Sequence, residues 1–458
     1  MSTAAGDDAG RMSDPALSLL ERVLAADPKD AGAHRAMARA REERGDALAG
    51  LAHLIAAQTL EAHAAGSPGR STAELCKVAT GYFMKGDLAS AEGWYRLVLL
   101  LDPHVAAAYQ NLAAIHADRG ELAEAESCRQ RAYAIQRVFV EPVDAPVRQL
   151  LILCAGRTAG NVPFETLLSS GKSGRIKYVI DFAAEEEDDQ LPPFDLVFNA
   201  IGEPDVAAPL AGRLDRFAAR CGRPVLNLPA AVGRTQRHRL ADLLGDLADV
   251  ALASCSRHEG PPQSRADLLE RLAQDGLTLP VLARPAATHG GQGLLRCESL
   301  EALEHALQQI DGAHYLTALH DVRSGDGHCR KYRIVFVDRK PYAYHLAISA
   351  HWMVHYFSAD MEAHPRKIDE ERRFLDDPRA ALGDRAMAAI TAIGHRLDLD
   401  YAGVDFAILP DGRVFVFEAN ATMLVHFERA NGMLAYRNVH VQRIVDAFEQ
   451  LVANRAAA

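Results

Sequence analysis

Long apolar runs and paired cysteines are both missing from this chain of 458 residues. Its strongest apolar runs, such as Leu97–Leu101 and Leu150–Cys154, hold five residues each, whereas a membrane-spanning helix needs about 20. No apolar segment follows basic residues near the N-terminus, so we expect no signal peptide. The seven cysteines include no CxxC pair, which argues against a disulfide framework and a thiolate zinc site. We therefore expect a cytoplasmic protein with reduced thiols and no membrane partner.

An excess of positive charge is missing as well. Lys and Arg number 50 against 61 Asp and Glu, which gives a formal net charge of −11. A mildly acidic chain is a poor general ligand for nucleic acid, although a local basic pocket for phosphates remains compatible with it. Apolar residues (49%) and charged residues (24%) occur at globular proportions. The length therefore predicts about three folded domains.

The N-terminal third has apolar residues at helical spacing, interrupted at Gly45-Asp46, Gly86-Asp87 and Gly120-Glu121. Gly86 and Gly120 are 34 residues apart, the period of tetratricopeptide repeats. The segment from Thr72 resembles such a repeat at Leu75, Ala79, Tyr82, Gly86, Ala91, Tyr95 and Pro103. We assign residues 1–140 to tetratricopeptide-like helical repeats. Such repeats suggest a protein or peptide partner in a concave groove; the alternatives are packing onto the rest of the chain, or a homodimer.

Residues 147–233 read as a small parallel sheet covered by helices on both faces. Glu141–Pro146 contains two prolines and reads as a linker. Short apolar strands are expected at Val147–Cys154, Ile176–Ile180, Asp195–Ala200 and Val225–Leu228. This order is Rossmann-like, but no GxGxxG is present, so a dinucleotide site is poorly supported.

Beyond this sheet, the sequence predicts a helix over Arg234–Leu247 and a strand over Leu279–Arg284. The strand ends in a cation and opens into a loop of small residues, Pro285–Gly293. Glycines leave backbone N–H groups free to approach phosphate oxygens. The alternative is an ordinary flexible turn.

A hairpin near the C-terminus carries the strongest chemical signal. Strands over Tyr401–Leu409 and Arg413–Ala419 flank the turn Asp411-Gly412. Asp405 and Glu418 are equidistant from this turn and so face each other, and Asn420 leaves the strand on the same face as Glu418. Converging carboxylate and amide oxygens suit Mg²⁺ that also binds substrate phosphates. The alternative is a polar stripe facing solvent.

Residues 147–458 resemble the ATP-grasp superfamily. The segments that carry the resemblance are RTQRHRL at 234–240, VLARPAATHGGQG at 281–293, KYRIVFVDRKPYAYHLAIS at 331–349 and VDFAILPDGRVFVFEANAT at 404–422. The last is similar to the metal site of the D-alanine–D-alanine ligase type, and the third to bacterial glutathione synthetase. The resemblance implies an α/β (α+β) ATP-grasp fold with a Rossmann-like pre-grasp domain at 147–233 and an ATP-grasp domain at 234–458. Its central subdomain would cover about 234–312 and its C-terminal subdomain about 313–458, preceded by an all-α repeat solenoid.

The resemblance also implies roles for particular residues. Arg284 and Arg237 (or Arg239, since the register of RTQRHR is ambiguous) would meet the nucleotide phosphates. Leu319 would lie in the hinge that reads adenine, and Asp321 would bind the ribose. Arg333 would meet substrate or developing charge. The phosphate-covering loop would use Thr288, Gly290, Gly291 and Gly293, while Asp405, Glu418 and Asn420 would hold two Mg²⁺ ions, with Mn²⁺ as an alternative.

The chain departs from the glutathione synthetase pattern at one position. That pattern has a second Arg fifteen residues beyond Arg333, where this chain has Ile348. Nearby His345, His351, His355 and Tyr356 are candidates for the missing substrate contacts, and a transition-metal site is a weaker reading of the three histidines.

The resemblance implies an ATP-dependent ligase that joins small-molecule carboxylate and amine substrates through an acyl phosphate. The alternative is a repeat-based scaffold or regulatory protein whose grasp domain binds nucleotide without ligating.

Overall fold

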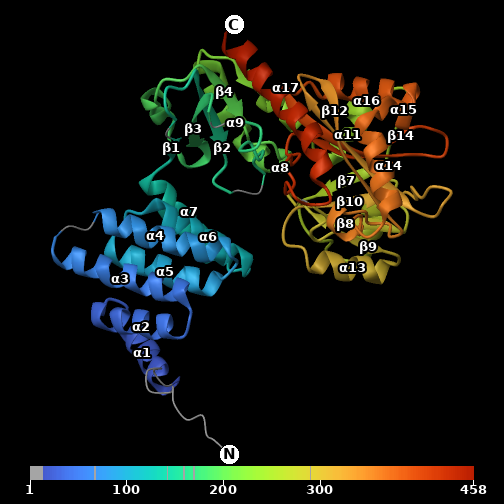
Figure 1. The fold of residues 1–458 in the computed structure, drawn as a ribbon. Coiled ribbons are helices and arrows are strands. Elements are labelled where there is room, and N and C mark those ends of the chain that lie inside the picture. Colours follow the sequence, from blue (N-terminus) through green and yellow to red (C-terminus); the bar gives the residue numbers. More distant parts are fainter. Residues whose placement is uncertain are drawn as a thin grey trace, which may run out of the picture. The chain divides into compact units, whose positions relative to one another are not determined.

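The computed structural model describes residues 14–66, 69–141, 143–157, 160–168, 171–288 and 290–457. The chain divides into two units, Met1–Arg137 and Val138–Ala458, and Figure 1 shows helices in the first and mixed helices and strands in the second. In the part of the chain that the structure describes, no helix is both long and apolar enough to cross a membrane.

The first unit consists of helices that pack as successive neighbours along the chain. Small side chains at the contacts, such as Ala56, Ala79 and Ala108, are fully buried and let the helix axes approach closely. The helices are α1 (Asp14–Ala26), α2 (Ala31–Glu43), α3 (Ala47–Ala64), α4 (Gly69–Met84), α5 (Leu88–Leu101), α6 (Ala106–Asp118) and α7 (Leu122–Ile135).

Gly45, Gly86 and Gly120 end α2, α4 and α6 in the same conformation. Their φ angles are 78°, 78° and 77°, a left-handed backbone that favours glycine. Each glycine N–H donates to the carbonyl three residues earlier, and the next N–H donates five residues back, as in Asp46 to Arg41 at 2.9 Å. The expected breaks between helices are confirmed, and the tetratricopeptide assignment stays a prediction.

The second unit begins with a sheet of order β1-β3-β2-β4-β5, in which β2, β3, β4 and β5 run parallel. The expected parallel sheet is confirmed. Strand β1 is an antiparallel edge strand on β3. The sequence does not predict it, because it falls at the boundary between the expected helical repeats and the expected linker. The strands are β1 (Val138–Glu141), β2 (Arg148–Cys154), β3 (Ser173–Val179), β4 (Leu196–Asn199) and β5 (Val225–Leu226), and the associated helices are α8 (Pro204–Ala207), α9 (Ala211–Arg220) and α10 (Pro229–Gly233).

The second sheet has the order β7-β10-β8-β9 and a separate hydrophobic core. Leu268 and Leu303 from its two helices pack with Leu316 of β10 in that core. The elements are β7 (Cys255–His258), α12 (Arg265–Gln274), β8 (Val281–Pro285), β9 (Leu295–Cys297), α13 (Leu300–Gln308) and β10 (His314–Ala318).

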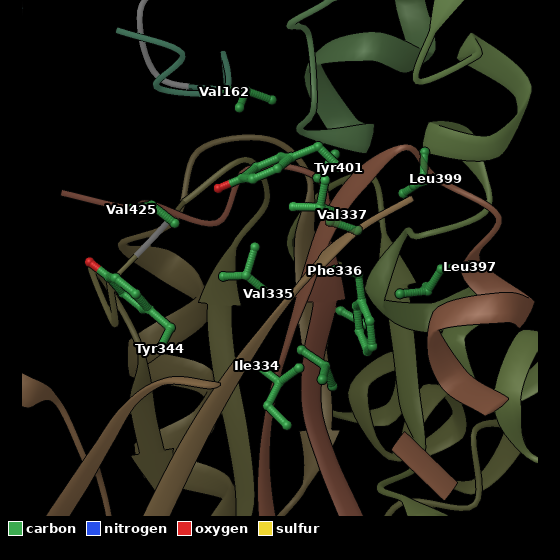
Figure 2. Close-up of a cluster of buried hydrophobic side chains, with 14 of the residues drawn as sticks. Val162, Ile334, Val335, Phe336, Val337, Tyr344, Leu397, Leu399, Tyr401 and Val425 are labelled. Atoms are coloured by element: carbon green, nitrogen blue, oxygen red, sulfur yellow. The ribbon is translucent and has the colours of Figure 1, made fainter. Parts of the chain in front are cut away.

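The third sheet has the order β12-β11-β13-β14-β6 and shares one hydrophobic core with the first sheet. Figure 2 shows part of this core around Phe336 and Tyr401. Helix α17 lies between these two sheets (Figure 1), where its Phe448 packs on Phe198 of β4 and Tyr401 of β13 at ring distances of 5.3 and 5.8 Å. The elements are α11 (Leu240–Leu244), β6 (Val250–Leu252), β11 (Cys329–Val337), β12 (Lys340–Ser349), α14 (Pro365–Asp376), α15 (Pro378–Leu382), α16 (Asp384–Leu397), β13 (Tyr401–Ile408), β14 (Val414–Asn420) and α17 (Asn438–Ala456).

The helix expected over Arg234–Leu247 is wrong in extent. Gln236 has an extended backbone (ψ 136°), a 3-10 turn covers Arg237–Arg239, and α11 spans only Leu240–Leu244. The turn allows the Arg237 side chain to reach Glu418. The segment thus departs from the regular helix that its sequence favours at the point where Arg237 pairs with Glu418.

Candidate active site

A cavity of about 320 Å³ lies between the second and third sheets. Strands β7, β8 and β10 contribute one wall, and β11, β13 and β14 contribute the other. Two loops complete it, one after β8 and one after β12. Residues from opposite sheets and distant parts of the chain therefore meet at one space.

Four polar residues form a row across the third sheet. Glu418 on β14 pairs with Asp405 on β13, Asp405 pairs with Arg333 on β11, and Arg333 pairs with His345 on β12. Directly paired residues lie on the same face of a sheet. The predicted opposition of Asp405 and Glu418 is thus confirmed, and the predicted turn at Gly412 (φ 85°) is present. A register shift between Asp405 and Phe406 brings Glu418, rather than Phe417, opposite Asp405.

Two cations hold the Asp405 carboxylate. Arg333 donates from Nε to Oδ1 at 2.5 Å and from Nη2 to Oδ2 at 2.8 Å, and Lys331 Nζ lies 3.0 Å from Oδ2. Burial alone would raise the pKa of Asp405. Arg333 and Lys331 lower the pKa by more than burial raises it, so it lies well below its usual range. Asp405 therefore remains an anion although it is almost completely buried.

Arg237 forms an ion pair with Glu418 across the cavity. Burial would raise the pKa of Glu418, but Arg237, Lys331 and Arg284 together outweigh burial and lower the pKa to about 2. Arg237 lines the cavity, whereas Arg239 is exposed and is not among the lining residues. The geometry thus favours Arg237 over Arg239 as the cation of this segment.

Asn420 is not among the residues that line the cavity, although it lies two residues after Glu418 on β14. It is buried, and its Oδ1 accepts hydrogen bonds from the Thr422 N–H at 3.0 Å and hydroxyl at 2.9 Å. Among the described residues, no three His, Cys, Asp or Glu side chains gather as a metal site. Asp405 and Glu418 nevertheless fit Mg²⁺, which commonly takes one or two carboxylates and completes its shell with phosphates and water. The Asn420 ligand stays a prediction.

Arg284 is the next-to-last residue of β8, just before the loop, and it is buried. Its Nη2 donates to the Thr288 carbonyl and, at 3.0 Å, to the Thr288 hydroxyl. Burial, and then Arg237, lowers the pKa of Arg284 to about 10, so the guanidinium remains charged near neutral pH. Arg284 thus combines a charge at the cavity with a bond that shapes the loop.

The loop glycines adopt left-handed backbone. Gly290, Gly291 and Gly293 have φ angles of 61°, 79° and 67°. Gly290 and Gly291 line the cavity, whereas Gly293 and Thr288 do not. A side chain at Gly290 would approach His355 Nε2 at 3.3 Å, so the backbone passes close to the loop after β12. His289 of the predicted loop lies outside the described residues.

The segment after β10 forms an apolar end of the cavity. Leu319 and Asp321 both line it, and their roles at a base and a ribose stay predictions. The His320 ring lies 4.9 Å from the Phe415 ring, and the exposed Asp321 accepts a hydrogen bond from the Arg323 N–H at 3.1 Å. The surroundings suit a flat, partly apolar group with hydroxyls at one side.

The sequence interpretation missed Lys331 and Glu203. Lys331 is two residues before Arg333 on β11, so strand alternation could have placed it on the same face. Glu203 precedes α8 of the first sheet; burial raises its pKa to about 7, against the lowering effect of Arg237. No sequence signal joins Glu203 to Arg237, because they meet only in the tertiary fold. Of the named histidines, His355 lines the cavity, while the buried His345 lies beyond Arg333 in the row.

No family model and no curated protein matches the sequence. Among solved structures, the chain is similar to the D-alanine–D-alanine ligase of Bacillus anthracis complexed with ATP, at 13% identity over 68% of this chain and 99% of that chain, with a TM-score of 0.43. It is similar to a RimK domain ATP-grasp protein of Sphaerobacter thermophilus at 18% identity, 65% and 98% coverage and a TM-score of 0.40. The VanG D-Ala:D-Ser ligase of Enterococcus faecalis has 12% identity, 66% and 99% coverage and a TM-score of 0.40. These likenesses are too distant to assign an activity.

Proposed function

We propose that the chain is an ATP-dependent ligase of the ATP-grasp type that joins a carboxylate to an amine through an acyl phosphate. The observation that carries the proposal is the row Glu418–Asp405–Arg333 facing Arg237 and Arg284 across one cavity. Two anions beside several cations suit a metal-bound polyphosphate, and a second anionic substrate can bind beside it.

The chemistry requires two displacements. A carboxylate oxygen attacks the γ-phosphorus of ATP, the bond to the β-phosphate oxygen breaks, and ADP leaves. The amine then attacks the acyl carbon, phosphate leaves with the carbon–oxygen bond electrons, and the amine loses a proton. No enzyme nucleophile is needed for either step.

Four cations of the cavity have tasks in this scheme. Arg237 and Arg284 bind the phosphate chain and hold it at the loop of Gly290 and Gly291. Arg333 lies at the far end of the carboxylate pair, where it meets the substrate carboxylate and then the oxyanion that forms when the amine attacks. Lys331 adds a second charge at the same end.

Asp405 and Glu418, with Asn420 proposed as the third ligand, would hold two Mg²⁺ ions. When bound, Mg²⁺ neutralises the negative charge of the phosphates during transfer. The carboxylates are ionised before any ligand arrives, because Arg237, Lys331 and Arg333 keep their pKa values low. They therefore accept a cation without first releasing protons.

We also propose that the first unit is a tetratricopeptide-like module that binds a protein or peptide in the cytoplasm. The repeated glycine turns and small-residue helix contacts support this assignment.

The ligase proposal is tested by a phosphate-release screen with Mg-ATP and mixtures of amino acids, dipeptides and hydroxy acids. Some pair of substrates should stimulate phosphate release above the rate with ATP alone, and Glu418→Gln should abolish that stimulation. Release that is unaffected by Glu418→Gln would refute the assigned site.

A further inference from the structure

The carboxylate of Asp205 connects the first sheet's domain to the second sheet. Asp205 lies on the short helix α8, and Tyr315 on β10 donates its hydroxyl proton to this carboxylate, with oxygen separations of 2.8 and 2.9 Å. Burial, and then Asp205 itself, raises the pKa of Tyr315, so the hydroxyl stays protonated and can donate. The Asp205 side chain is only 5% exposed, and a buried carboxylate of this kind requires partners.

Three more groups meet the same carboxylate. Arg257 Nε of β7 lies 3.4 Å from Oδ1, and Gln236 Nε2, from the segment before α11, lies 3.3 Å from Oδ1. The Ala287 N–H, at the start of the loop after β8, donates to Oδ2 at 3.4 Å. One side chain thus contacts two strands of the second sheet and the loop that borders the cavity.

The contacts of Asp205 join two parts of the unit that do not share a hydrophobic core. The second sheet has its own hydrophobic core, separate from the core shared by the first and third sheets. Polar contacts such as those of Asp205 therefore help to fix the second sheet against the domain that contains the first sheet. Loss of the carboxylate removes several of them at once.

The start of the loop is fixed from two sides. Ala287 has a left-handed backbone (φ 55°) that most non-glycine residues avoid. Asp205 accepts from the N–H of Ala287, and Arg284 donates to the carbonyl of Thr288. Gly290 and Gly291, whose N–H groups we assign to the nucleotide phosphates, follow directly.

We propose that Asp205 is a positioning residue for nucleotide binding. It docks the second sheet on the domain that contains the first sheet, and it sets the start of the phosphate-covering loop. The nucleotide part of this inference rests on the proposed function; the docking part does not. Asp205 acts through Ala287 and Tyr315 and does not itself touch the cavity.

A second cluster in the same unit provides a matched control. Asp188 is 7% exposed, accepts from the Tyr178 hydroxyl at 2.8 Å and from Arg213 at 2.9 Å, and is not among the cavity residues. Asp188→Asn therefore removes a carboxylate of similar burial and with similar partners. Tyr315→Phe and Tyr178→Phe form a milder pair, for use if an Asp variant does not fold.

The experiment compares these variants in the full chain. Hydrogen exchange without nucleotide is measured for peptides covering β7, β10 and Ala286–Thr288, and steady-state kinetics are measured over a range of ATP concentrations. For Asp205→Asn we expect faster exchange in those peptides, with the KM for ATP raised about tenfold and kcat within about twofold of wild type. Asp188→Asn should change neither the exchange in those peptides nor the KM.

Unchanged exchange and KM in Asp205→Asn would overturn the inference. Equal increases in Asp188→Asn would also overturn it, because they would show general loosening of the unit. If the wild-type protein neither binds nor consumes ATP, the proposed function fails, and the exchange comparison still decides whether Asp205 holds the second sheet and the loop.

Discussion

Arg333 and Asp405 form a two-bond ion pair across neighbouring strands, with Nε 2.5 Å from Oδ1 and Nη2 2.8 Å from Oδ2. The planar guanidinium matches both carboxylate oxygens, which a lysine cannot do. The pair is buried at the cavity floor, so its geometry fixes where positive charge meets an incoming substrate.

Arg333→Lys should keep the charge and lose the paired geometry. We expect turnover to fall about 100-fold, while the melting temperature changes little because Lys331 still neutralises Asp405. Steady-state turnover and thermal unfolding measure the two effects. Arg330→Lys is the control, since Arg330 on the same strand binds Asp326 with two bonds of 3.0 and 2.8 Å but does not line the cavity. Equal losses of turnover in both variants would contradict a catalytic role for Arg333.

Glu418→Gln should weaken metal binding without unfolding the protein. The amide has nearly the same shape as the carboxylate but lacks the charge that a divalent cation requires, so Mn²⁺ affinity in the presence of ATP should fall more than about tenfold. Electron paramagnetic resonance of free Mn²⁺ measures this. Glu449→Gln removes a buried carboxylate that pairs with Arg148 at 3.4 Å, away from the cavity, and should leave the affinity unchanged. Wild-type affinity in Glu418→Gln would exclude Glu418 as a ligand.

Much of this site could be predicted because local sequence fixes it. The turn at Gly412 brings Asp405 within one residue of a position opposite Glu418, so their proximity could be predicted from the chain alone. The register shift beside Asp405 that makes them direct partners could not. The cations that neutralise the two carboxylates could not be predicted either, since Arg237 is 181 positions from Glu418. Asp205 has no recognisable motif, because its role depends on contacts with β7 and β10 that only the packed sheets create.

His34 and His53 make the first unit sensitive to acid. Their Nδ1 atoms are 2.9 Å apart beside Trp94. Burial, and then His34, lowers the pKa of His53 to about 4, whereas the unfolded chain has a pKa near 6.5. The unfolded state thus binds more protons between these values, and the stabilisation present above pH about 6.5 is lost as pH falls towards 4, by about 3 kcal/mol.

Trp94 reports this loss directly. The chain has two tryptophans, so Trp352→Phe leaves Trp94 as the fluorescent probe for denaturant unfolding at each pH. His53→Gln should reduce the pH dependence, and His104→Gln, at a histidine that is 81% exposed, should not. A free energy of unfolding that is constant from pH 6.5 to about 4.5 would contradict the assignment.

The fragment Val138–Ala458 should fold without the helical unit, because among the described residues its hydrophobic cores are made of its own side chains. A second fragment that starts at Asp144 lacks β1 and leaves the edge of β3 unpaired. We expect it to melt at a lower temperature, since the N–H and C=O groups at the edge of β3 lose their partners. Circular dichroism of both fragments measures this, and an insoluble Val138 fragment would show that the helices are required for folding.

The fate of the oxygen atoms tests the central claim most directly. Once the screen has identified a substrate pair, the carboxylate is labelled with ¹⁸O and the products are analysed by chromatography and mass spectrometry. Activation by phosphoryl transfer predicts ADP and orthophosphate in equal amounts, with one ¹⁸O atom transferred from the carboxylate to the phosphate. AMP and pyrophosphate, or phosphate that carries no label, would contradict the account even if an amide were formed.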